Sequence, residues 1–197
     1  MPDSIFPPIP GGGIKELGQP GVPTRHPYRG EEFSGGGSGN GFFRVATGYT
    51  HLVQGDNQVV TNSTTLVSSN DLSQFFDIRV HYLIEAYISF TAHADADFKL
   101  ALRYTGSAAI RAVCFGQDTA GAWLGQYMDE TNTVPLQGNG VATYAACHIM
   151  GTLDTDTTTP TPGRFVVQFA QQVAHASDAA LWHPSWVRVT RIGGSFA

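Results

Sequence analysis

The fold of this chain is decided by the stretch RVHYLIEAYISFTAHADADFKLALRYT, residues 79–105. From Val80 to Phe90 every even position is apolar, and all the odd positions except Leu83 are polar or amphipathic. The alternation resumes from Phe98 to Tyr104, after a turn-like segment rich in Asp and Ala. A period of two over this length is typical of half-buried antiparallel strands. The stretch therefore predicts two consecutive strands.

The rest of the chain after Asn40 repeats short apolar segments between turn residues. Breaks are expected at Ser68–Asp71, Asn132–Asn139 and Asp154–Gly163, among others. No helical period extends beyond a few residues. Eight or nine strands at this spacing predict an all-β fold, a jelly-roll β-sandwich. The strands are expected near Phe42–Thr47, Val59–Leu66, Phe75–Ala92, Asp97–Tyr104, Ala108–Phe115, Ala122–Met128, Gly140–Leu153, Arg164–Ala174 and Ser185–Ile192.

Composition excludes several classes of partner. The net charge is −5 and the basic residues are scattered singly, so a nucleic-acid partner is not expected. No apolar run is long enough for a signal peptide or a membrane span, which favours synthesis in the cytoplasm and no membrane partner. The two cysteines, Cys114 and Cys147, are expected to be free thiols, although they could pair if their strands are adjacent.

Residues 1–40 differ from the domain expected over residues 41–197. They hold seven of the eleven prolines and two glycine runs, which disfavour regular structure. Apolar residues interspersed in this Pro-rich segment suit an extended arm that lies in a groove of another subunit. The alternative is a disordered tail with incidental apolar residues. As the contact residues of the arm we expect Ile5, Phe6, Pro7, Pro8, Ile9, Ile14 and Leu17.

No motif assembles a catalytic centre. The glycine run that begins at Gly35 is not followed by the Lys-Ser/Thr of a phosphate-binding loop. His93, Asp95 and Asp97 offer ligands for a hard cation, as do Asp154 and Asp156, but Asp-rich turns are usually only turns. We therefore expect no enzyme activity, no cofactor and no metal.

The aromatic residues of the C-terminal half are expected to pack in the core or at subunit contacts. An exposed Trp182 that stacks on a sugar is the functional alternative. The residues expected to pack in this way are Tyr144, Phe165, Phe169 and Trp186.

The end of the chain carries a resemblance to a known family. The stretch Gly163–Ile192 resembles the final two strands of the TNF/C1q-like jelly rolls of tailed-bacteriophage virion proteins, with a loop of small residues between the two strands. Val59–Leu72, leading into Val80–Phe90, is similar to the opening of these domains. The chain departs from the pattern at Trp186, where Leu or Val is common, and at His183-Pro184, which replaces a glycine-containing turn.

The resemblance implies a homotrimer of jelly rolls, a form that would also cover Leu83, Tyr87 and Val166 on outward sheet faces. Such domains serve as capsid decoration (cement) proteins or as fibre and tail tips. Residues 1–40 leave no room for a fibre shaft, so we expect a structural virion protein that binds the major capsid protein on the outer capsid surface and stabilises it. It would be made in the host cytoplasm. The alternative is a receptor-binding or tail-tip head domain whose exposed aromatics and Asp154–Pro162 loop contact a host glycan.

Overall fold

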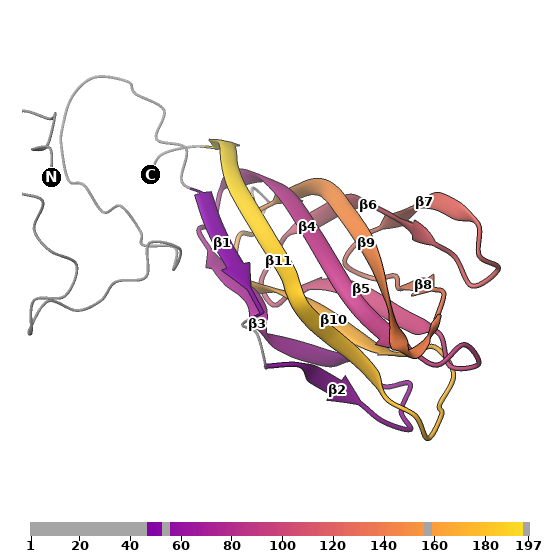
Figure 1. Ribbon diagram of the computed structural model, residues 1–197. Helices are drawn as coiled ribbons and strands as arrows, with labels where there is room; N and C mark the ends of the chain where they lie inside the picture. The colour runs from indigo at the N-terminus through magenta and orange to yellow at the C-terminus, as the bar shows by residue number, and fades with distance from the viewer. Residues whose placement is uncertain (1–46, 53–55, 156–158, 195–197) are drawn as a thin grey trace, which may run out of the picture.

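The computed structural model describes residues 47–52, 56–155 and 159–194, and the expected arm at residues 1–40 lies outside these ranges. The described residues form eleven strands and no helix, so none of them forms a helix able to cross a membrane (Figure 1). The strands are β1 (Thr47–His51), β2 (Gln58–Val60), β3 (Val67–Phe76), β4 (Val80–Ala92), β5 (Phe98–Tyr104), β6 (Ala109–Gln117), β7 (Trp123–Met128), β8 (Val134–Leu136), β9 (Gly140–Asp154), β10 (Gly163–Gln171) and β11 (Ala179–Gly194).

The strands form two antiparallel sheets that pack face to face as a sandwich (Figure 1). One sheet has seven strands in the order β1-β11-β4-β9-β6-β7, with β2 paired to a further part of β11. The other has four strands in the order β3-β10-β5-β8. The apolar inner faces of the two sheets meet in one core.

The strand pairing is that of a jelly roll. The pairs β1·β11, β3·β10, β4·β9 and β5·β8 are nested in the sequence, and successive pairs alternate between the two sheets. This nesting is the double Greek key that defines the fold. The β6–β7 hairpin is inserted between β5 and β8, where it extends the seven-stranded sheet beyond β9. The predicted all-β jelly-roll sandwich is therefore confirmed.

The core is formed by the apolar residues at alternate positions of the strands. In β4 every even position from Val80 to Phe90 is buried. On β5 and β10, Phe98 and Phe169 continue a stack of rings that begins at Phe90, with centroid separations of 4.3 Å for Phe90–Phe98 and 5.9 Å for Phe98–Phe169. Because Phe90 belongs to the seven-stranded sheet and the other two rings to the four-stranded sheet, this stack joins the two layers.

Three local predictions are wrong. The strand expected at Val59–Leu66 ends at Val60, and the break expected at Ser68–Asp71 lies inside β3. Polar residues are tolerated in β3 because it is an edge strand and its hydroxyls are paired: the Leu72 N–H donates to Ser69 Oγ at 3.1 Å. The loop expected at Asn132–Asn139 contains β8, another edge strand, where a proline costs no hydrogen bond of the ladder.

Both cysteines are buried and free, and they lie on the adjacent strands β6 and β9. Hydrogen bonding to the Cys114 thiol, followed by burial, raises the pKa of the Cys147 thiol well above its ordinary value. The Cys147 thiol therefore stays protonated at physiological pH and packs as a neutral core side chain.

Candidate functional site

The outer face of the seven-stranded sheet carries a row of ring-bearing side chains that crosses five strands. The strand register places its members opposite one another, from β1 through β11, β4 and β9 to β6. Side chains that share a face alternate with those that point into the core, so these residues point outward together. The row consists of His51, Trp186, Tyr87, His148 and Phe115.

A second row lies beside the first, two residues further along each strand, and extends to β7. This row contains one ion pair, in which Arg188 Nε donates to Glu85 Oε2 at 2.7 Å. Apolar and aromatic residues flank the ion pair on both sides. Its members are Tyr49, Arg188, Glu85, Met150, Val113 and Tyr127. We call the two rows together the aromatic band.

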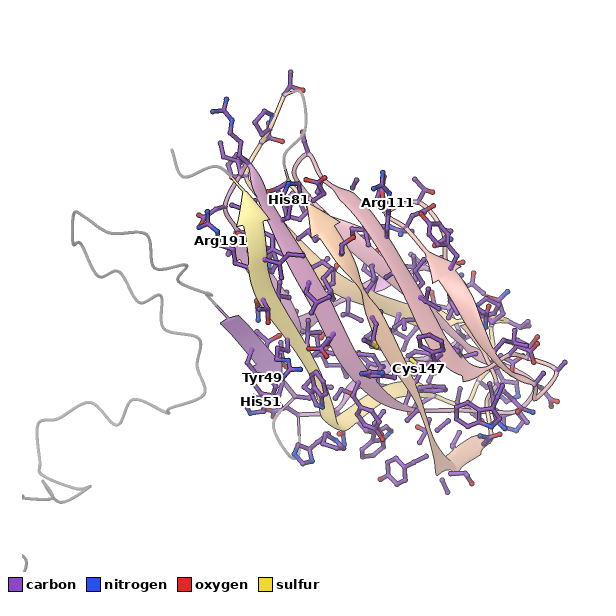
Figure 2. The ribbon with its side chains drawn as sticks, turned by 90° about the horizontal axis from the view of Figure 1, so that it is seen from above. Tyr49, His51, His81, Arg111, Cys147 and Arg191 are labelled. Carbon is purple, nitrogen blue, oxygen red and sulfur yellow. The ribbon has the colours of Figure 1, made fainter. Side chains whose placement is uncertain are left out.

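The aromatic band is open to solvent in the single chain. Phe115, Met150 and Tyr127 are 47%, 44% and 55% exposed, and Trp186 and Tyr87 are half-buried. Figure 2 looks onto this face, over which the described residues form no third layer. Monomeric proteins rarely leave so continuous an apolar strip uncovered. The band therefore has the character of an interaction surface.

The rings at the β1 end of the band contact one another. The Trp186 ring lies 6.0 Å from that of Tyr49, nearly parallel to it, and 6.5 Å from that of His148, edge to face. These contacts hold the indole in place before any partner binds. Such pre-ordering reduces the side-chain entropy lost on association.

Apart from the Arg188–Glu85 pair within the band, several charged groups lie at one end of the sheet. His81 Nδ1 is 3.1 Å from Asp154 Oδ1, and Figure 2 shows Arg111 and Arg191 at the same end. Within the band, the Arg188–Glu85 pair brings opposite charges together. An apolar strip with a polar margin is the usual anatomy of a protein–protein interface.

The residues expected to pack lie in three different environments. Phe165 and Phe169 are fully buried, and Trp186 lies in the aromatic band. Tyr144 is 61% exposed at the start of β9, where its ring meets Trp182 edge to face at 5.4 Å, so it is not a core residue. Of the outward residues expected to need cover, Val166 is already buried, at 6% exposed, on the four-stranded sheet.

Sequence reasoning did not single out Phe115, Met150 and Tyr127, which are exposed hydrophobic members of the aromatic band. A signal was present in β6, where Val113 and Phe115 alternate with buried small residues on a strand expected to be half buried. Only the register across β6, β7 and β9 brings these side chains together with Trp186.

An open cavity of about 440 Å³ lies beside Trp182, at the end of the sandwich where β4 ends and β11 begins. The Trp182 indole N–H donates to Thr91 Oγ1 at 2.9 Å, which fixes the ring. Both polar and apolar side chains line the opening. The lining residues include Asn57, Val59, Val141, Ser177 and Asp178.

His93, Asp95 and Asp97, which the sequence offered as possible cation ligands although no metal was expected, do not converge as a set. Asp97 instead accepts a hydrogen bond from the Gly138 N–H at 2.8 Å. His93 and Asp95 lie near His175, which comes from the β10–β11 loop. The other expected pair includes Asp156, which lies outside the described residues. Over the described ranges, no hydroxyl or thiol side chain donates a hydrogen bond to a histidine.

Comparisons with known proteins add little. No family model matches the chain, and no curated protein matches it. Among solved structures it is similar to the VP2 subviral particle of infectious bursal disease virus, at 10% identity over 83% of this chain and 45% of that one, with a TM-score of 0.24. The Gx strain structure of the same virus gives 11% identity over 77% and 43%, with a TM-score of 0.22. The chain thus spans less than half the length of these proteins, and TM-scores this low carry no argument about function.

Proposed function

We propose that the protein is a structural component of a virion, a homotrimer of jelly rolls that binds the outer surface of the capsid and stabilises it. The observation that carries this proposal is the aromatic band. A surface of this kind is built for a permanent protein contact, and its partner on this proposal is a second copy of the same chain.

The size of the aromatic band fits a subunit interface. It crosses six strands, and the five spacings of about 4.8 Å between them give a width of about 24 Å. A standard interface buries about 800 Å² per partner, so this strip supplies part of one. The resemblance to TNF/C1q-like virion domains favours three copies around an axis, an arrangement that closes on itself. Light scattering of the full chain should then give three times the mass of one chain.

The arm at residues 1–40 is proposed to attach the trimer to the major capsid protein. Three arms on one trimer act together, because binding of the first raises the effective concentration of the others. Phe6 is the proposed anchor, since burial of an aromatic side chain of this size contributes about 1.5–3 kcal/mol. The flanking prolines restrict the unbound segment and so reduce the entropy lost on docking.

Removal of residues 1–40 should abolish co-sedimentation with capsids that lack this protein, while light scattering still gives the trimer mass. The Phe6→Ala variant of the full chain should bind with intermediate affinity. Its melting temperature should match that of the parent, because Phe6 is expected to lie outside the jelly-roll core. If residues 41–197 co-sediment as tightly as the full chain, the arm has no role in attachment.

The cavity beside Trp182 favours a second candidate, a receptor-binding or tail-tip head domain that contacts a host glycan. Aromatic rings and acidic or amide groups around an opening of this size suit a neutral sugar. If this function is correct, calorimetry with lactose, maltose and chitobiose should show saturable binding of at least one. The Tyr144→Ala variant should weaken that binding at least tenfold, because the exposed Tyr144 ring contacts Trp182. Absence of heat with all three sugars at millimolar concentration would count against this candidate.

A further inference from the structure

Two loops meet at the end of the sandwich where β4 ends and β11 begins. The turn between β4 and β5 and the loop between β10 and β11 each connect one sheet to the other (Figure 1). Main-chain hydrogen bonds join them: Val173 N–H donates to Ala96 O at 2.8 Å, and Gln172 N–H to Asp97 O at 3.3 Å. The two loops therefore hold a fixed relation to each other.

The backbone at His175 is held by a buried side chain. Gln171 is fully buried, and both the oxygen and the nitrogen of its side-chain amide form hydrogen bonds with the main chain of His175. Its Oε1 accepts from the His175 N–H at 3.0 Å, and its Nε2 donates to the His175 carbonyl at 2.9 Å. His175 is thus presented from a rigid position, although it lies in a loop.

The two loops bring a pair of imidazole rings together. The rings of His93 and His175 stack with centroids 4.1 Å apart and planes 13° apart. Each Nδ1 accepts a main-chain N–H two residues further along, from Asp95 at 3.2 Å and from Ser177 at 3.0 Å. Each Nδ1 is therefore unprotonated, and a metal ion that bound to it would take the place of the main-chain N–H.

A carboxylate completes the group. Asp95 Oδ2 lies 3.6 Å from His93 Nδ1, and the carboxylate is exposed and free to rotate. One donor atom from each of His93, Asp95 and His175 lies within 4.8 Å of the other two. Ligand atoms around a tetrahedral ion are about 3.3 Å apart, given metal–ligand distances of about 2.0–2.1 Å. The remaining difference of about 1.5 Å is within the reach of side-chain rotation.

We propose that His93, Asp95 and His175 bind one divalent transition-metal ion, with water in the remaining position. Two imidazoles and one carboxylate favour Zn²⁺, Co²⁺ or Ni²⁺ over Mg²⁺ or Ca²⁺, which prefer all-oxygen sites. Binding requires the rings to turn out of their stack, because a metal ion lies in the plane of the imidazole that holds it. Both rings are only half-buried, so part of each ring faces solvent rather than the core.

The bound ion would act as a structural cross-link between the two loops. It would fix the β4–β5 and β10–β11 connections to each other and so tie the two sheets at one end of the sandwich. Because the ligand geometry exists only in the folded chain, the free energy of binding adds to that of folding. The site lies apart from the aromatic band, so metal binding would stabilise the fold in a monomer as well as in a trimer.

The test is equilibrium dialysis of the full chain against Zn²⁺, with Co²⁺ absorption in the visible range as a second probe. We expect one Zn²⁺ per chain and a rise in melting temperature of about 5–10 °C at a free concentration one hundred times the dissociation constant. His93→Gln and His175→Gln should each lower the affinity at least one-hundredfold, and Asp95→Asn about tenfold. The His81→Gln variant is the matched control, because His81 is also a solvent-accessible histidine beside a carboxylate, that of Asp154.

Two results would overturn the proposal: no saturable binding by the full chain up to millimolar Zn²⁺, or binding that falls as much in His81→Gln as in His175→Gln. Melting in the presence of a chelator separates loss of metal from loss of fold. If a histidine variant fails to fold, Asp95→Asn decides the question, because this exposed side chain can be changed without cost to the core. Unchanged affinity in Asp95→Asn would then exclude the three-ligand site.

Discussion

The Phe115→Glu variant is expected to be a folded monomer, whereas the parent chain is expected to be a trimer. Phe115 lies in the aromatic band, 47% exposed in the single chain, so a glutamate there is solvated in the monomer. In the trimer the same carboxylate would be buried without a partner, and its desolvation would cost several kcal/mol at each interface. Multi-angle light scattering at micromolar concentration should show the mass fall threefold.

The matched control is Phe75→Glu. Phe75 is 81% exposed on β3, in the other sheet, where its ring lies near the Arg164 guanidinium. The substitution introduces the same charge into the same kind of exposed ring position but leaves the aromatic band intact. Its mass should equal that of the parent. A trimer that survives Phe115→Glu but not Phe75→Glu would show that the subunits meet through the four-stranded sheet.

The class of fold could be predicted from the sequence because it follows from a local pattern. Alternation over Val80–Phe90 and Phe98–Tyr104 defines two strands and their buried faces without knowledge of any partner. The extent of β3 could not be predicted in the same way. Most of its residues are polar, and they form a strand because β10 pairs with them. Pairing between distant segments thus overrides local propensity there.

The candidate sites were harder to predict than the fold because each depends on segments far apart in the chain. The aromatic band requires the register of β1, β11, β4, β9, β6 and β7. The proposed metal site requires His175, about eighty residues after His93, and no spacing rule for ligands covers that separation. Sequence reasoning grouped His93 and Asp95 with Asp97, because Asp97 is near them in sequence. In the structure the Asp97 carboxylate instead accepts a hydrogen bond from the Gly138 N–H.

The Phe98→Ala variant is expected to lose about 3–5 kcal/mol of the free energy of unfolding, which places it among the most damaging single truncations in the chain. Phe98 is fully buried between Phe90 of one sheet and Phe169 of the other, so its removal leaves a cavity at the junction of the two layers. At about 2–4 °C per kcal/mol, the melting temperature should fall by about 6–20 °C. Phe75→Ala, at an exposed position, is the control and should change the stability by no more than about 0.5 kcal/mol. Equal losses in the two variants would mean that the ring stack does not hold the sheets together.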